Sequence, residues 1–301
     1  MIDAAGGTLV VLLRFLALVA TTGALGAWVF GRFVAGRLAG DAGQRHRSSL
    51  QLLSVRVGIW CSAALVISSG LRLLAQAAAF AEPGDPLWPS AMAVLQSRWG
   101  WALAVQALLA ATACVALLWG LRTRRWPHVA EACIAGLAVV PAFLGHAGAA
   151  EEWRVLSVLI DFLHVLAAGG WVGALAMLTA AVLRARRGAE APVFAAALVV
   201  AFHPVAMVAA STVFATGLAT AWLRMGAPVG IASSSYSGLF VAKLLVVGVT
   251  GALGAGHSKL ATRRRQVVGL TSVSRTLLTE TLLAVLVLAI TAILSGTDPI
   301  G

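Results

Sequence analysis

The chain has 301 residues, of which 60% are hydrophobic and 11% charged, and its mean hydropathy is +0.93. These values exclude a soluble domain, and several apolar runs reach the roughly 20 residues that cross about 30 Å of hydrocarbon. The net charge of +11 does not predict a nucleic-acid partner, because the basic residues lie in clusters between the apolar runs. The sequence therefore predicts an all-α, polytopic transmembrane helical bundle whose principal partner is the lipid bilayer.

The basic clusters predict the orientation of this bundle. Cytoplasmic loops of membrane proteins carry an excess of Lys and Arg. Sixteen of the 22 basic residues fall in the four segments 32–56, 122–125, 184–187 and 259–275. The pattern predicts about eight spans, with these four segments in the cytoplasm and both termini outside.

The first four expected spans are 8–31, 52–79, 99–121 and 128–146. The first run is longer than the core of a signal peptide, so we expect it to be retained as a helix. The segment 82–89 is rich in Pro and Gly and is expected to form an outer loop. The fourth span is short and is interrupted by Pro141. Residues 1–139 are predicted to form an N-terminal, four-span half.

The last four expected spans are 154–182, 192–223, 239–257 and 276–295. With the end of the fourth span they make up a second half, residues 140–301, in the same membrane-embedded unit. The fifth span contains a run of small residues: Ala167, Ala168, Gly169, Gly170 and Gly173. Small residues allow another helix to approach closely, so the fifth span is expected to be a tightly packed central helix.

The same span carries two polar side chains, Asp161 and His164, in an apolar run. Ionisable residues within a membrane are costly and are candidates for function. Helix rise places His164 roughly 15 Å below the outer face, and His203 of the sixth span roughly 16 Å above the inner face. In hydrocarbon about 30 Å thick, the two imidazoles are expected at a similar depth.

Imidazole is a common transition-metal ligand, and Met207, one turn after His203, adds a thioether that favours Cu(I). Asp161 lies one turn before His164 and is expected to act as a hydrogen-bond acceptor that sets the tautomer of its ring. A different interpretation is that each histidine only forms a hydrogen bond with a neighbouring helix. The three cysteines show no CxxC spacing and are expected to be core residues.

No nucleophile elbow, phosphate loop or HExxH motif occurs in the sequence, so we expect a protein that is not an enzyme. The second half contains the segments Gly145-His146-Ala147, Leu163 to Ala168, Trp171 to Leu175, Phe202-His203-Pro204, Thr216-Gly217, and Tyr236 to Lys243, with Glu280 and Pro299 after them. Together these segments resemble the copper resistance D (CopD) family.

The resemblance implies a bacterial inner-membrane protein that moves copper from the periplasm to the cytoplasm. His146 and His164 match family positions, whereas His203 stands where the family usually has a serine. We therefore expect His146, His164, His203 and Met207 to be metal ligands, and a separate periplasmic copper-binding protein to supply the ion. Two alternatives remain: a b-type haem held axially by His164 and His203, in an electron-transfer subunit, and an accessory subunit of a larger membrane complex.

Overall fold

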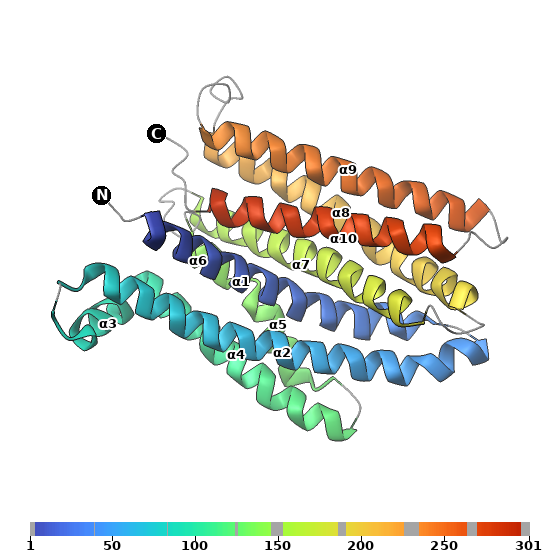
Figure 1. The fold of residues 1–301 in the computed structure, drawn as a ribbon, viewed down its shortest axis with the longest axis horizontal. Coiled ribbons are helices and arrows are strands. Elements are labelled where there is room, and N and C mark those ends of the chain that lie inside the picture. The colour runs from blue at the N-terminus through green and yellow to red at the C-terminus, as the bar shows by residue number, and fades with distance from the viewer. Residues whose placement is uncertain are drawn as a thin grey trace.

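All regular elements in the described part of the chain are helices, and they lie side by side in an elongated bundle (Figure 1). The all-α prediction is confirmed. The computed structural model describes residues 4–38, 40–82, 84–123, 126–145, 153–185, 191–225, 235–263 and 270–295.

The long helices match the expected spans in order. They are α1 (Ala4–Val29), α2 (Gly40–Phe80), α4 (Arg98–Thr123), α7 (Arg154–Ala185), α8 (Ala191–Met225), α9 (Ser235–Arg263) and α10 (Leu270–Leu294). The fourth expected span is divided into α5 (His128–Leu137) and α6 (Val140–Leu144), since the chain makes a turn at 138–139, just before Pro141.

Six helices in the described residues are long and apolar enough to cross a membrane. Two shorter apolar helices, His128–Leu144 and Val241–Gly254, lie where the fourth and seventh spans were expected. The protein is therefore a multi-pass membrane protein. The full count of eight crossings and the outside location of both termini stay predictions.

The expected outer loop at 82–89 is shorter than predicted. A helix, α3 (Leu87–Gln96), begins inside it, with Pro86 as its extended N-cap residue. Pro89 lies in the first turn of α3. Backbone N–H groups in a first turn have no carbonyl partner within the helix, so the N–H that proline lacks costs no hydrogen bond. Ser97 then separates α3 from α4, and its hydroxyl accepts a hydrogen bond from the backbone N–H of Gly100 at 3.0 Å. This N-cap starts α4.

The end of α1 changes its winding, which the sequence did not predict. A π-helical turn (Phe30–Val34) and a short 3-10 turn (Ala35–Arg37) follow Val29. Gly31 lies in the π-helical turn, and a Cβ there would collide with the Ser54 hydroxyl. That hydroxyl accepts a hydrogen bond from the indole N–H of Trp126 at 3.2 Å. The glycine thus allows α1 to lie directly against the contact between Ser54 and Trp126.

Helix α1 lies between α2 and α7. It makes extensive contacts with α2 on one side and with α7 on the other (Figure 1). A Cβ on Gly26 would collide with the backbone of Gly173, and a Cβ on Gly173 would collide with the carbonyl oxygen of Thr22. The expected close approach to the small residues of the fifth span is confirmed, and the approaching helix is α1.

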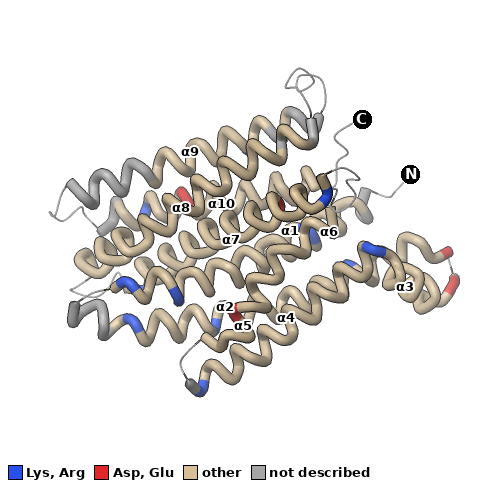
Figure 2. Tube along the Cα trace, turned by 180° about the vertical axis from the view of Figure 1, so that it is seen from behind, with Lys and Arg blue, Asp and Glu red and all other residues tan. Residues whose placement is uncertain are grey.

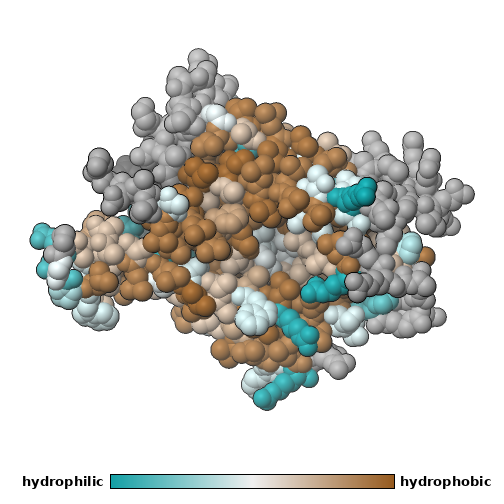
Figure 3. Space-filling view, viewed as in Figure 1, coloured by the Kyte–Doolittle hydropathy of each residue, from teal (hydrophilic) through white to brown (hydrophobic). Residues whose placement is uncertain are grey.

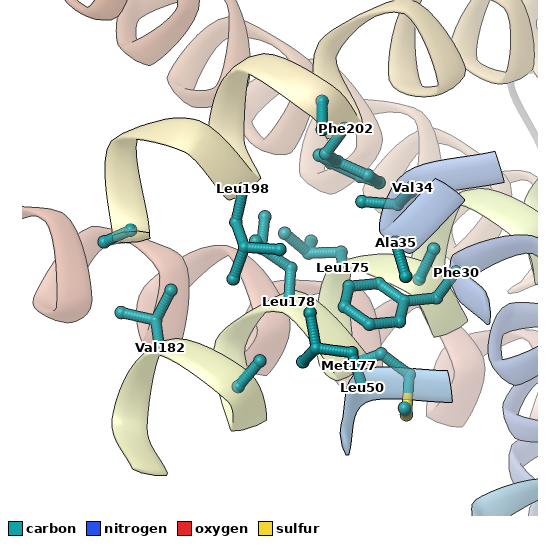
Figure 4. Packing of buried hydrophobic residues seen from close by; sticks show 14 of the residues in the cluster. Phe30, Val34, Ala35, Leu50, Leu175, Met177, Leu178, Val182, Leu198 and Phe202 are labelled. Carbon is teal, nitrogen blue, oxygen red and sulfur yellow. The ribbon is translucent and has the colours of Figure 1, made fainter. Parts of the chain in front are cut away.

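A buried apolar cluster joins the two turns that follow α1 to α2, α7 and α8. Phe30 is fully buried and lies against side chains of α7 and α8 (Figure 4). Leu175 and Leu178 project from α7 into the cluster, and Leu198 and Phe202 reach it from α8. This packing holds α7 and α8 in a defined register. The register in turn positions His164 of α7 against Thr216 of α8.

The surface has the distribution expected of a membrane bundle. Hydrophobic side chains cover the middle of the molecule, and hydrophilic ones gather towards its ends (Figure 3). Glu82 and Asp85 mark the end that carries α3 (Figure 2). Arg37, Arg47 and Arg122 are exposed near the opposite ends of their helices. These two ends are called the α3 end and the arginine end below.

Candidate metal centre

The candidate site lies between α7 and α8, which pack together along much of their length. His164 is half-buried on α7, and its Nδ1 atom lies 3.0 Å from the hydroxyl oxygen of Thr216 on α8. Thr216 is buried, with 7% of its surface exposed. The imidazole is therefore held in place by a neighbouring helix.

The hydrogen bonds of Thr216 define which ring nitrogen of His164 carries the proton. The Thr216 hydroxyl donates to the backbone carbonyl of Thr212 at 2.6 Å. A hydroxyl has one hydrogen, so its oxygen is left to accept a hydrogen bond from the Nδ1–H of His164. A neutral imidazole protonated at Nδ1 has its lone pair on Nε2. The contact therefore sets the tautomer that binds a metal ion through Nε2.

A glycine lies beside the same ring. A Cβ at Gly217 would be 3.7 Å from Cε1 of His164, the carbon between the two ring nitrogens. The Thr216-Gly217 pair therefore gives the imidazole a hydroxyl at Nδ1 and leaves the adjacent ring edge uncovered by any larger side chain at position 217. Both features suit a ring that must be approached by an ion.

The structure separates His164 from His203. His164 is level with Thr216 on α8, and His203 lies 13 residues earlier on the same helix. Thirteen residues of α-helix span about 20 Å. The expected common depth therefore does not hold, because α7 and α8 have 32 and 35 residues and are much longer than the bilayer is thick. The depth of His164 was counted from the outer end of α7 and that of His203 from the inner end of α8. In helices longer than the bilayer, these two counts end at different levels.

This separation excludes one haem held by both histidines. Axial ligands bind the same iron atom from opposite sides, which a distance of about 20 Å along the helix does not allow. Met207 lies one turn after His203 on the outer surface of α8, where 53% of its area is exposed. Its neighbour Val208 is 70% exposed on the same surface. The described residues therefore do not bring Met207 together with His164.

The structure gives less information on the two remaining predicted site residues, Asp161 and His146. Asp161 is half-buried one turn before His164, and its predicted effect on the ring remains a prediction. His146 falls outside the described residues. Within the described ranges, no group of three or more His, Cys, Asp or Glu side chains gathers in a way that would hold a metal ion.

A second polar contact lies on α7, fifteen residues after His164. The hydroxyl oxygens of Thr179 and Thr281 are 2.8 Å apart and join α7 to α10. Glu280, next to Thr281, is 5% exposed, and its Oε2 atom lies 3.9 Å from the position that a Cβ on Gly254 would take. A carboxyl group is thus buried between α9 and α10, in the half of the bundle nearer the arginine end.

Thr216 was not predicted as a site residue, although a signal for it exists. Threonine in an apolar span often forms hydrogen bonds across helices. His164 lies ten residues from the start of α7 at Arg154, and ten residues back from the end of α8 at Met225 is Ala215. Because the two helices are antiparallel neighbours, counting from the ends that they share leads to Ala215, the residue before Thr216.

Two family models match the chain. The model described as "Copper resistance protein D-like, N-terminal domain" matches residues 1–156, and the model described as "Copper resistance protein D" matches residues 196–294. The first half therefore shows the family likeness as well, although its sequence resembled the family only in general character. His203 and Met207 fall within the second match, and His164 lies between the two.

One curated protein is also similar. It is the "Copper transport protein CutJ" of Bacillus subtilis (strain 168), which is 30% identical over 168 residues. These residues are 54% of this chain and 29% of the curated protein, so the alignment spans less than a third of that relative. No solved structure matches the chain significantly. Since the N-terminal family model alone covers more than half of the 301 residues, the chain belongs to the copper resistance protein D family of membrane proteins.

Proposed function

We propose that the protein transports copper across a bacterial inner membrane, from the periplasm to the cytoplasm, and that His164 binds the ion within the bilayer. Membership of the copper resistance D family supports the choice of metal. The name of the similar Bacillus subtilis protein supports transport as the activity. In this proposal the chain acts as a permease and has no enzymatic activity.

The observation that carries the proposal is the contact between His164 and Thr216. A histidine within an apolar span is costly unless its polar atoms are satisfied. Here the hydroxyl of Thr216 engages Nδ1 at 3.0 Å and thereby directs the lone pair to Nε2. A site with few ligands suits transport, because an ion that is bound too tightly cannot leave.

The positive charges within the spans favour a path through the second half. Arg14 on α1 and Arg72 on α2 are half-buried in the part of the bundle nearer the α3 end. The Arg72 guanidinium lies 5.5 Å from the ring centroid of Trp99 on α4. Because these charges repel a cation, a route between α7 and α8 is favoured over one among α1, α2 and α4.

The remaining candidate ligands take separate positions in this proposal. His146 receives the ion on the outer side from a periplasmic copper-binding protein. His203 lies about 20 Å inward of His164 along α8, so it would bind the ion in a later step, with the Met207 thioether one turn away. The buried carboxyl of Glu280 offsets the charge of a cation in the inner half of the bundle.

The test is copper uptake by proteoliposomes that contain the purified protein. We expect His164→Ala to lower the initial uptake rate at least about tenfold, since one ligand of a sparse site is lost. His128→Ala is the matched control, because that side chain is 94% exposed at the start of α5 and should leave uptake unchanged. Uptake by His164→Ala at the rate of the unmodified protein would sink the proposal, provided that both elute as one peak in gel filtration.

A further inference from the structure

A hollow of about 580 Å³ lies on the outside of the bundle between α4 and α5. Ala111, Val115 and Trp119 line it from α4, and Pro127 and Val129 line it from the start of α5. Almost all of the lining is apolar. The volume falls in the range of about 300–1,000 Å³ that is typical of ligand sites.

The hollow lies where α4 ends and α5 begins, since Trp119 is near the end of α4 and Pro127 directly precedes α5. Near their far ends they are in contact, since a Cβ on Gly136 of α5 would lie 3.4 Å from the side chain of Leu109 of α4. The chain leaves α4 after Thr123 and enters α5 through Pro127, an extended residue that cannot continue a helix. The groove therefore extends to the arginine end, which the positive-inside rule assigns to the cytoplasm.

A basic residue stands at this end of the groove. Val115, Trp119 and Arg122 follow one another at spacings of four and three residues, so they share one face of α4. Arg122 is exposed in the last turn of α4. Trp119 is 73% exposed one turn earlier, where an indole ring suits the boundary between lipid tails and headgroups.

The length of the groove agrees with one lipid leaflet. Eleven residues separate Ala111 from Arg122, which corresponds to about 16 Å of helix. Half of the hydrocarbon core of a bilayer is about 15 Å thick. An acyl chain lying along the groove would thus reach from the headgroup level to the middle of the membrane.

The acidic residue nearby does not oppose a negatively charged ligand. Glu131 lies two residues after Val129, so it is on the other side of α5 from the groove. Its carboxylate is 3.6 Å from the Arg32 guanidinium and 3.2 Å from the His128 ring. The charge of Glu131 is therefore compensated by contacts outside the groove.

We propose that the groove between α4 and α5 binds an anionic phospholipid of the inner leaflet, with an acyl chain against Val115 and Trp119 and its phosphate at Arg122. Basic sites between helices on the cytoplasmic side of a membrane protein suit such headgroups. This site is independent of His164 and of copper.

The experiment compares retained lipids by native mass spectrometry of the purified protein. Phosphatidylglycerol and phosphatidylcholine with identical acyl chains are added in equal amounts. The unmodified protein is expected to retain several-fold more phosphatidylglycerol. Arg122→Gln should abolish this preference, whereas Arg184→Gln, an exposed arginine in the last turn of α7, should keep it.

A second pair of variants tests the groove itself. Ala111→Leu fills its deep end and should lower the retention of both lipids, whereas Ala104→Leu, on the exposed surface of the same helix, should not. Equal retention of the two lipids by the unmodified protein would overturn the proposal, as would an unchanged preference in Arg122→Gln. A dimer that Ala111→Leu dissociates would also overturn it, since a second copy would then occupy the groove.

Discussion

The tautomer of His164 that can bind a metal ion depends on Thr216, which lies 52 positions further along the chain. The Thr216 hydroxyl is itself held by the backbone carbonyl of Thr212, so its one hydrogen is not available to the ring. This chain of two hydrogen bonds directs the imidazole lone pair to Nε2. It also ties α8 to α7 at the level where copper is proposed to bind.

We therefore predict that Thr216→Val weakens copper binding about 10- to 100-fold, the usual effect of losing a partner of a metal-bound histidine. Valine keeps the shape of threonine but removes the hydroxyl. Thr212→Val is the matched control, because that hydroxyl donates only to the Val208 carbonyl among the contacts that the structure describes. Titration with a competing Cu(I) chelator measures both affinities, and equal values for the two variants would contradict the role of Thr216.

Helix α7 has two functional faces, and its glycines belong to only one of them. Gly169 and Gly173 lie against α1, with Leu25 of α1 next to Gly169. His164 is directed to α8 instead. Close backbone contact on one side and a polar contact on the other hold α7 firmly between α1 and α8. This is the packing that small residues favour in membranes, where helix association relies on close van der Waals contact.

The α1–α7 crossing should accordingly be sensitive to a single methyl group. Gly173→Ala places a Cβ against the Thr22 carbonyl and the Gly26 backbone, which cannot move as a flexible side chain can. We expect a loss of stability of about 1–3 kcal/mol. Thermal unfolding in detergent measures it.

Gly70→Ala is the control for the same substitution. A Cβ on Gly70 meets nothing within 4 Å, and alanine in a helix interior is favoured over glycine by about 0.5–1 kcal/mol. Its unfolding temperature should stay the same or rise. A Gly173→Ala protein as stable as Gly70→Ala would show that α1 and α7 are not held by backbone contact.

For the molecule as a whole, charge and packing are distributed differently. Among the described residues, Arg37, Arg47, Arg122 and Arg184 lie near one end of the bundle, and Glu82 and Asp85 lie at the other (Figure 2). The tightest packing runs across the middle, where the backbones of α1 and α7 lie against each other. Orientation in the membrane and cohesion of the bundle thus depend on different residues.

The orientation can be tested with single cysteines at the two ends. Asp85→Cys in the turn before α3 should react with a membrane-impermeant maleimide added to intact spheroplasts, because the positive-inside rule places this end outside. His128→Cys at the arginine end should react only after the membrane is opened. The unmodified protein, whose three cysteines are half-buried, provides the background. The reverse labelling pattern would contradict the proposed topology.

Local patterns in the sequence were sufficient to predict the helical membrane class, the positions of the long helices and the tight packing of Gly169 to Gly173. Hydropathy and small-residue spacing act within one helix, so they can be recognised without knowing its neighbours. Which helix packs against a given face cannot be recognised from that helix alone. That α1 fills the glycine face, and that Thr216 meets His164, follows from how the helices pack.

The depth of His203 illustrates why the relative positions of the helices could not be predicted from the sequence. Helix rise alone placed it beside His164, but α8 extends well beyond the thickness of a bilayer, so its axial position is not set by its ends. The buried cluster around Phe30, Leu175 and Leu198 sets that position instead. Register between two antiparallel helices is decided by side chains far apart in the chain, which no local pattern contains.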